Sequence, residues 1–301
     1  MGYRHIMIEN PVELSVSHGQ LCVHTEQGTA SFPLEDLDAI LLENRKSRIT
    51  SAALAALAAS GCAVFFCDER HLPCGILQPF QQHSRQSGVL RTQLSCTVPQ
   101  KKRLWQQIVK QKIRNQAICL RECGKTEPAE RLQVMANGVL SGDTSNVEGA
   151  AAAYYFPKLF GEGFLRGDEM EHVNAALDYG YAILRGMIAR TLSVHGLQPS
   201  FGLQHHSTLN AFNLADDLIE PFRPVVDLYM GRKALPPEGL TSAVKRELVD
   251  LLNMDMQIRG QKNTVSHAME QTVQSLLRCM KGEEKELLLP VLLPLQRHRY
   301  E

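Results

Sequence analysis

The pattern of the sequence changes near residue 82, and this change constrains the fold more than any other feature. Before it, short segments rich in strand-forming residues are separated by turn signals such as Asn-Pro, His-Gly and Gln-Gly-Thr. Beyond about residue 98, apolar residues recur at the spacing of long helices. The sequence therefore predicts an α+β protein, in which a small β-sandwich-like N-terminal domain precedes a larger, all-helical domain that carries the candidate chemistry.

The expected domain boundaries follow from these patterns. We expect the β domain over residues 1–82, a polar linker over 83–92 and the helical domain over 93–301. The expected strands are Arg4–Glu9, Glu13–His18, Gln20–Glu26, Thr29–Pro33, Asp38–Leu42, Ala63–Cys67 and Gly75–Leu77, with one helix at Ser51–Ala59. The expected helices of the second domain are Lys101–Cys123, Ala129–Asn137, Thr144–Phe156, Glu169–His195, Asn210–Ile219, Thr241–Asn253 and Thr264–Met280.

Two features of the chain predict an intracellular protein without a membrane segment. The N-terminus lacks the basic segment and apolar core of a signal peptide, and the longest apolar stretch, Ile49–Cys67, is interrupted by Gly61. Eight cysteines without an export signal favour buried free thiols over disulfides. The cysteine cluster at residues 62–74, which includes His71, lacks the paired spacing of a zinc site. We therefore expect a soluble, cytoplasmic protein.

The charge of the chain is unevenly distributed although its formal net charge is zero. Residues 91–135 carry 10 basic and 3 acidic side chains. On the helix expected there, Arg103, Lys110, Arg114 and Arg121 fall within one narrow sector. Such a stripe suits DNA phosphates, although a solvated basic face fits the pattern equally well.

The stretch most informative about function is GLQHHSTLNAFNLADDLIEPFRP. In it, His205 and His206 precede a helix-like segment that carries Asp217 and Glu220 on one face. Glu148 lies upstream among small and aromatic residues, where a buried carboxylate needs a partner or a metal. Imidazole and carboxylates from separate helices are typical ligands of a divalent metal. The alternative is an acidic cluster that forms only a structural ion pair with a nearby arginine.

Several long motifs make the chain resemble a known family. The resemblance is to the CRISPR-associated spacer-acquisition integrase, the first of the two universal adaptation proteins. It is carried by SNVEGAAAAYYFPKLF, NAALDYGYAILRGMIARTLSVHGLQPSFGLQHH and NAFNLADDLIEPFRP. Two further segments, FFCDERHLPCGILQPF and QIVKQKIRNQ, are similar to that family as well, so the resemblance covers nearly the whole chain. The form NLADDLIEPFRP looks most like the type II systems.

This resemblance implies an activity and a set of site residues. The implied activity joins the 3′-hydroxyl ends of a short double-stranded DNA fragment to CRISPR repeat DNA by metal-dependent transesterification. The implied cofactor is Mg²⁺ or Mn²⁺, and the implied catalytic residues and metal ligands are Glu148, His205 and Glu220. The spacing from His205 to Glu220 is one residue longer than in many relatives, so His206 and Asp217 stay open as alternative ligands.

The resemblance also implies partners. It implies a homodimer, for which we expect the N-terminal β domain to provide the dimer contact, and a complex with the small second adaptation protein. The residues expected to bind DNA are Arg103, Lys110, Arg114, Arg121 and Arg223, the last of which is expected either to brace Glu220 or to bind phosphate. Two other functions stay open: a stand-alone metal-dependent DNase or junction resolvase, and a non-catalytic DNA-binding scaffold.

Overall fold

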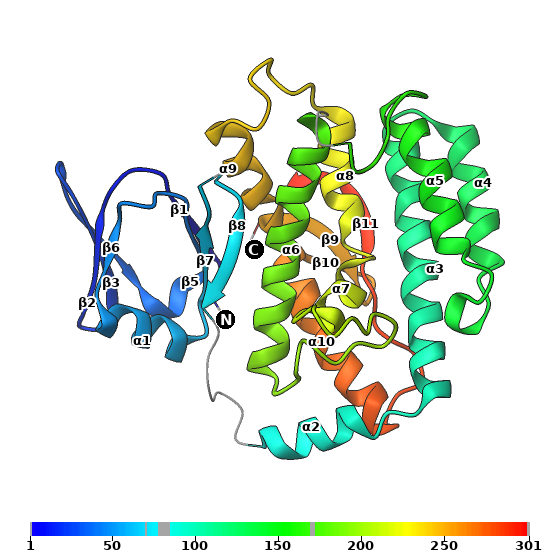
Figure 1. Ribbon diagram of the computed structural model, residues 1–301, viewed down its shortest axis with the longest axis horizontal. Coiled ribbons are helices and arrows are strands. Elements are labelled where there is room, and N and C mark those ends of the chain that lie inside the picture. Colours follow the sequence, from blue (N-terminus) through cyan, green and yellow to red (C-terminus); the bar gives the residue numbers. More distant parts are fainter. Residues whose placement is uncertain (1, 70, 78–84, 169–171, 300–301) are drawn as a thin grey trace. The chain divides into compact units, whose positions relative to one another are not determined.

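The computed structural model describes residues 2–69, 71–77, 85–168 and 172–299 (Figure 1). The chain divides into two compact units. The first, here called the β unit, comprises residues 1–86 and 193–196, and the second, the helical unit, comprises residues 87–192 and 197–301. The predicted order, a β-rich N-terminal region followed by a mostly helical region, is confirmed.

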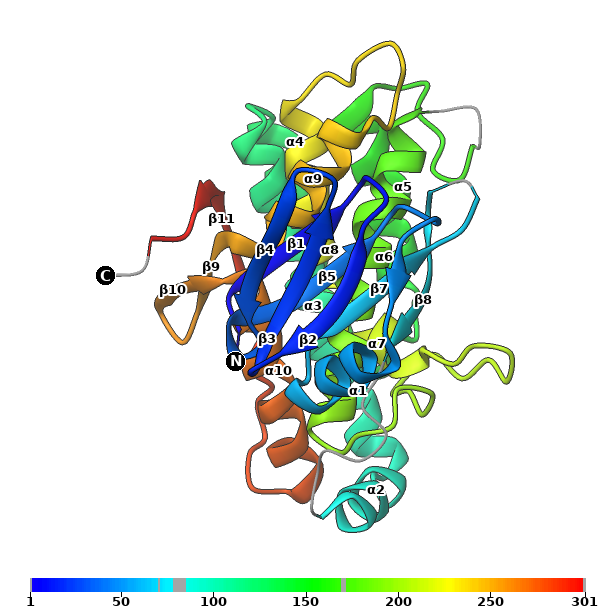
Figure 2. The same cartoon turned by 90° about the vertical axis from the view of Figure 1, so that its left-hand side faces the viewer.

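The β unit contains two four-stranded sheets. Its elements are β1 (Arg4–Ile8), β2 (Glu13–Ser17), β3 (Gln20–Thr25), β4 (Gly28–Pro33), η1 (Leu34–Asp36), β5 (Leu37–Leu42), β6 (Arg48–Ile49), α1 (Ser51–Ser60), β7 (Ala63–Cys67) and β8 (Pro73–Leu77). One sheet has the order β1-β5-β7-β8, in which β1, β5 and β7 are parallel, and the other has the order β4-β3-β2-β6. Figure 2 shows β2, β3 and β4 in front of β1, β5 and β7, with α1 at one end of these layers.

A common core and a tight hairpin explain this arrangement. Leu14 of one sheet, Ile40 of the other and Leu57 of α1 are fully buried in the same apolar cluster. The β2–β3 hairpin turns at His18 and Gly19, whose φ angles of 48° and 73° are those that a two-residue hairpin requires. The β unit therefore has the layered, sandwich-like form expected from its turn signals.

The helical unit is built around one long central helix. Its helices are α2 (Gln86–Leu94), α3 (Val98–Glu122), α4 (Thr126–Asn137), α5 (Val147–Phe160), α6 (His172–Val194), α7 (Asn213–Ile219), α8 (Arg223–Arg232), α9 (Ser242–Asp250) and α10 (Val265–Lys281), with short 3₁₀ turns η2 (Ser141–Asp143) and η3 (Leu251–Asn253). Helix α3 begins with a capping box formed by Thr97 and Gln100, and it packs against α4, α5, α7 and α8 (Figure 1). Side chains from these helices can therefore meet at one face of α3.

The helical unit also contains a small antiparallel sheet, so the prediction of an all-helical domain was wrong in this respect. The sheet has the order β10-β9-β11, with β9 at Met254–Ile258, β10 at Gln261–Thr264 and β11 at Val291–Arg297. The β9–β10 hairpin turns at Arg259 and Gly260, with φ angles of 53° and 76°. Arginine is not a usual turn signal, and for this reason the hairpin was not expected.

Other boundaries also differ from the expected ones. Helix α2 begins at Gln86, inside the expected 83–92 linker, whose residues 83 and 84 lie outside the described residues. The expected helix start at Glu169 lies outside them as well. Helix α8 was not expected. Its Pro224 lies in the first turn, where the backbone N–H that proline lacks would have no partner within the helix. Among the helices of the described ranges, none combines the length and apolar character needed to cross a bilayer.

Candidate functional site

Glu148 and Glu220 meet at Lys112, a residue that the sequence analysis did not single out. Lys112 lies in the middle of α3 and is only 6% exposed. Its Nζ donates a short hydrogen bond to Oε1 of Glu148 and lies 2.5 Å from Oε2 of Glu220. Burial lowers the pKa of Lys112, but the carboxylates of Glu220 and Glu148 outweigh it, so the pKa is raised. The lysine is therefore a charged ammonium held between two carboxylates from separate helices.

Local capping fixes the position of Glu148 in the first turn of α5. Asn146 has a φ of 51°, which turns the chain into the helix. The carboxylate of Asp143 accepts hydrogen bonds from the backbone N–H groups of Val147 and Glu148, both at 2.9 Å. These bonds satisfy donors that a helix N-terminus leaves free. The backbone of Glu148 is thus anchored independently of what its side chain binds.

Glu220 directly follows α7 and is 4% exposed. Its Oε1 pairs with Nη2 of Arg223 at 3.1 Å, and the carbonyl of Pro221 accepts a 2.7 Å hydrogen bond from the side chain of Asn115 on α3. Burial raises the pKa of Glu220, but Arg223 and Lys112 outweigh it and hold the pKa below its ordinary value. Glu220 is therefore an ionised carboxylate with a cation at each oxygen.

A second layer of polar side chains supports Arg223. The guanidinium carbon of Arg223 lies 4.9 Å from the centroid of the Tyr181 ring, in cation–π geometry. The hydroxyls of Tyr181 and Tyr155 both donate to the carboxylate of Asp227 in α8, the latter at 3.1 Å. Asp227 is 1% exposed, and burial raises its pKa to about 6 against the opposing effect of the tyrosine hydrogen bonds. This network fixes the ring against which Arg223 rests.

His205 is oriented by Asp217, which is fully buried. Asp217 accepts hydrogen bonds from the backbone N–H groups of residues 203, 204 and 205 at 2.5, 3.2 and 3.1 Å. Its Oδ1 also lies 2.7 Å from Nδ1 of His205. An ionised carboxylate only accepts, so Nδ1 carries the proton and Nε2 of the neutral ring is left as the donor atom for a metal. The single tryptophan, Trp105, packs edge-on against this imidazole with ring centroids 5.8 Å apart.

The hydrogen bond to Asp217 raises the pKa of His205, more than burial lowers it, and the Glu220 charge adds to the rise. The ring of His206 is exposed like that of His205, but its Nδ1 bonds to the backbone carbonyl of Gln204 at 2.8 Å instead of to a carboxylate. Asp216 is also engaged elsewhere, because its Oδ1 lies 2.8 Å from Nε of Arg185. Asp217 therefore orients the ring of His205 and not that of His206, and the assignment of His205 as a metal ligand stays a prediction.

The predicted ligands Glu148, His205 and Glu220 carry donor atoms of the kinds that bind a divalent cation. Two carboxylates and one imidazole are suitable ligands for Mn²⁺ and, with more oxygen, for Mg²⁺. Oε2 of Glu220 is buried and lies against the ammonium of Lys112. In the described part of the chain, however, no three His, Cys, Asp or Glu side chains are arranged to hold a metal ion. The cation between the carboxylates is the ammonium of Lys112.

Comparison with known proteins identifies the family. The family model described as CRISPR associated protein Cas1 matches residues 6–232. The chain belongs to the Cas1 family. It is 43% identical to the CRISPR-associated endonuclease Cas1 of Neisseria meningitidis serogroup C (strain 8013), with 100% of both chains covered. It is 28% identical to a CRISPR-associated endonuclease Cas1 of Pyrobaculum aerophilum, with 80% of this chain and 85% of that protein covered.

Solved structures of a casposase and of a Cas1 protein share this fold. A casposase bound to integration product matches with a TM-score of 0.77 and 17% identity, covering 95% of this chain and 92% of that chain. A Cas1 protein from Thermotoga maritima matches with a TM-score of 0.72 and 16% identity, covering 93% of this chain and 97% of that chain. At these identities the likeness shows the fold alone.

Four of the five residues predicted to contact DNA lie on α3 in this Cas1-family chain, and the fifth, Arg223, lies on α8 and pairs with Glu220. Arg103, Arg114 and Arg121 are exposed and Lys110 is half-buried. Lys112, only two residues from Lys110, points instead into the cluster with the carboxylates. The same basic block therefore supplies both an exposed stripe and one buried cation, and DNA binding by the stripe stays a prediction.

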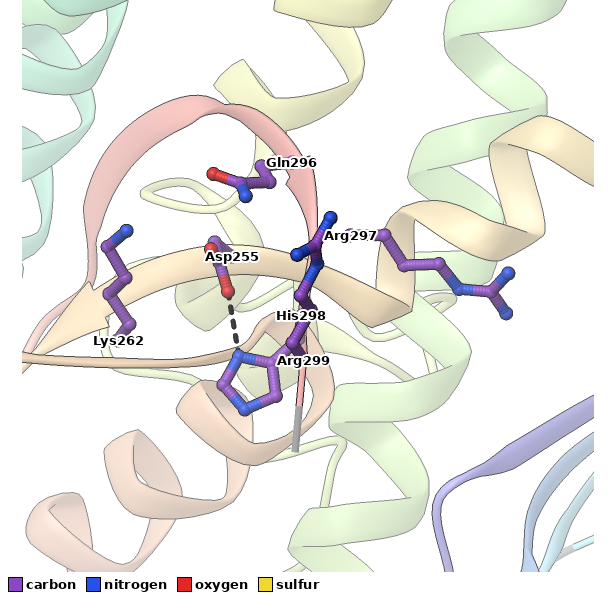
Figure 3. Close-up of a pocket in the computed structure, with 6 residues that line it drawn as sticks. All are labelled: Asp255, Lys262, Gln296, Arg297, His298 and Arg299. Carbon is purple, nitrogen blue, oxygen red and sulfur yellow. Dashed lines mark hydrogen bonds and ion pairs between the residues drawn. The ribbon is translucent and has the colours of Figure 1, made fainter. Parts of the chain in front are cut away.

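A pocket of about 410 Å³ lies elsewhere in the helical unit, on the β9–β11 sheet (Figure 3). Its lining residues are Asp255, Lys262, Gln296, Arg297, His298 and Arg299. Figure 3 shows His298 joined to Asp255, and the distance between Nδ1 and Oδ1 is 2.7 Å. None of the predicted site residues lines this pocket, so the candidate site is assigned from side-chain geometry instead of cavity shape.

Lys112 is the main site residue that sequence reasoning missed, although a signal was present. Ile108, Val109 and Ile113 form the buried side of α3, and Lys112 occupies a position on that same side. A lysine on the apolar face of an amphipathic helix needs a buried partner of opposite charge. The acid on α3 itself, Glu122, pairs with Arg232. The partners of Lys112 are therefore identified only by the packing of α3 against α5 and α7.

Proposed function

We propose that this chain is a metal-dependent DNA integrase and endonuclease that joins 3′-hydroxyl DNA ends to CRISPR repeat DNA by transesterification. The observation that carries the proposal is the meeting of two carboxylates from separate helices, Glu148 and Glu220, at one buried cation. The orientation of His205 by a buried carboxylate supports it. The names of the relatives, which are CRISPR-associated endonucleases, support action on nucleic acid.

The metal ligands of this proposal are Glu148, His205 and Glu220, and the cofactor is Mg²⁺ or Mn²⁺. When bound, such an ion polarises a scissile phosphate and stabilises the charge on the leaving oxygen. Asp217 holds the proton on Nδ1 of His205, so that Nε2 can act as a ligand. Arg223 keeps Glu220 ionised and in place. The nucleophile is the 3′-hydroxyl of the incoming strand, so the protein needs no nucleophile of its own.

The proposal includes the partners of this reaction. Solved relatives include a Cas1 protein in a complex with DNA and Cas1 in Cas6-RT-Cas1–Cas2 complexes. We propose DNA with 3′-hydroxyl ends, CRISPR repeat DNA and the second adaptation protein, Cas2, as partners of this chain, and a homodimer as its working form. The exposed residues Arg103, Arg114 and Arg121, together with the half-buried Lys110, supply charge complementary to DNA phosphates.

The test is a strand-transfer assay with a labelled 3′-hydroxyl DNA fragment and a repeat-containing target, with Mn²⁺ present. We expect covalent transfer by the wild type and loss of transfer in Glu148→Ala. Glu162→Ala is the matched control, because Glu162 is an exposed glutamate paired with Lys158 in an ordinary surface ion pair. Transfer that continues unchanged in Glu148→Ala contradicts the assignment.

The products of the same assay distinguish the proposal from hydrolysis. The word endonuclease in the names of the relatives favours free cleavage products as the second candidate activity. Joined fragment and target indicate strand transfer, whereas cut target without joined fragment indicates a metal-dependent DNase. Metal-independent DNA binding with neither product indicates a scaffold.

A further inference from the structure

The charges around the carboxylate pair are balanced by the protein itself. Glu148 and Glu220 supply two negative charges, and Lys112 and Arg223 contact them with two positive ones. Lys112 is 6% exposed, so little water screens its charge. A divalent ion bound by both carboxylates would compete with Lys112 for them, and it would add charge to four side chains whose formal charges already cancel.

From this charge balance we infer that Lys112 is an internal cation that competes with the metal and couples metal binding to DNA binding. The inference rests on the proposed function, because it concerns the same ligands. In the free protein the ammonium occupies the carboxylate pair, so divalent metal binds weakly. When DNA is bound, its phosphates add negative charge beside the cluster, so that the ammonium can pair with a phosphate oxygen while the carboxylates take the metal. Lys112 is thus a positioning residue for metal loading.

The contacts of Lys112 suit this role better than a purely structural one. Glu148 stays anchored through its backbone by Asp143, and Glu220 keeps Arg223 when the lysine withdraws. A flexible four-carbon stem with a compact charge can move between two anions, whereas the planar guanidinium of Arg223 is stacked on a ring. The site therefore has one cation that can withdraw and one that stays.

The first experiment measures Mn²⁺ affinity of the DNA-free protein from the electron paramagnetic resonance signal of unbound Mn²⁺. We expect Lys112→Met to bind Mn²⁺ at least about tenfold more tightly than the wild type, because the competing charge is gone. Lys158→Met, which removes an exposed ammonium paired with Glu162, should bind as the wild type does. A merely structural lysine would give the opposite result, since its loss would disorder the ligands and weaken binding.

The second experiment adds branched DNA that lacks the reactive 3′-hydroxyl, with the DNA alone as a blank for its own Mn²⁺ binding. The wild type should gain about tenfold or more in Mn²⁺ affinity, and Mn²⁺ should raise its DNA affinity by the same factor. Lys112→Met should gain much less. If this variant does not fold, the wild type with and without DNA decides the question, and Lys112→Arg should keep the weak binding of the free protein.

Two results would overturn the inference. One is equal Mn²⁺ affinity of the wild type with and without DNA, and the other is weaker binding in folded Lys112→Met. Either result leaves the proposed function standing if strand transfer still depends on Mn²⁺ and on Glu148. Absence of Mn²⁺ binding in every protein, even with DNA, overturns both the inference and the proposed metal site.

Discussion

The buried carboxylate of Asp227 should make the helical unit less stable as pH rises. Asp227 is 1% exposed, and burial raises its pKa from 3.8 to about 6. The folded state therefore holds this proton more tightly than the unfolded state. The stabilising effect is complete below the unfolded pKa and is lost as pH rises through about 6. The difference between the two pKa values corresponds to about 3 kcal/mol of unfolding free energy, because a shift of one pKa unit corresponds to about 1.4 kcal/mol.

The perturbation that isolates this effect is Asp227→Asn, which cannot titrate. Relative to the wild type, its free energy of unfolding should rise by up to about 3 kcal/mol between about pH 4 and about pH 8. Any constant loss from weaker hydrogen bonds to Tyr155 and Tyr181 shifts this difference equally at every pH. The other titratable groups are common to both proteins, so their effects largely cancel.

The assay is denaturant unfolding followed by fluorescence of Trp105, which is 5% exposed on α3 and is the only tryptophan in the chain. The fluorescence of Trp105 therefore reports the unfolding of the helical unit. Asp178→Asn serves as the control, since the side chain of Asp178 is 61% exposed and its removal should give a much smaller slope. A stability difference between Asp227→Asn and the wild type that does not change with pH, or that falls as pH rises, would refute the reasoning.

Three further predictions concern the loop that contains Gly202, Mn²⁺ binding by His205, and DNA binding by the basic residues of α3. A Cβ at position 202 would lie 2.2 Å from the carbonyl oxygen of His205 and would displace that residue, so Gly202→Ala should reduce strand transfer by about 10²-fold. Gly88→Ala is the control, because a Cβ at position 88 meets open space and should not reduce transfer. Because the pKa of His205 is raised above 6.5 and its protonated ring cannot bind metal, Mn²⁺ affinity should already weaken above pH 6.5 as pH falls; a flat titration contradicts this. Charge reversal at Lys110 and Arg114 should flatten the slope of log affinity for DNA against log salt by about two; an unchanged slope would mean that these residues are only a solvated face.

Local chemistry made much of the fold predictable. The apolar repeat indicated α3, although the expected start was Lys101 and the helix begins at Val98. The His-Gly turn indicated the β2–β3 pair. The sheet of β9, β10 and β11 was not predictable in this way, because its turn uses Arg259 in a left-handed conformation and its third strand comes after α10. Pairing between distant segments leaves little trace in a local pattern.

The candidate site was likewise predictable only where local sequence carries the signal. Glu148 and Glu220 could be singled out because a carboxylate among apolar neighbours needs a partner, although only Glu220 is buried and the side chain of Glu148 is 29% exposed. Which partner they have could not be read, since Lys112 reaches them only through the packing of three helices. The sequence also could not tell the adjacent histidines apart. The fold places Asp217 against the ring of His205 and a backbone carbonyl against the ring of His206.

The measurement that tests the central claim most directly is anomalous diffraction from crystals of the protein bound to branched DNA and Mn²⁺. The account predicts one manganese peak within coordination distance of Glu148, His205 and Glu220, with Lys112 moved away from the carboxylates. A peak bound elsewhere, for example at Asp255 in the β9–β11 pocket, with Lys112 still between Glu148 and Glu220, would contradict it.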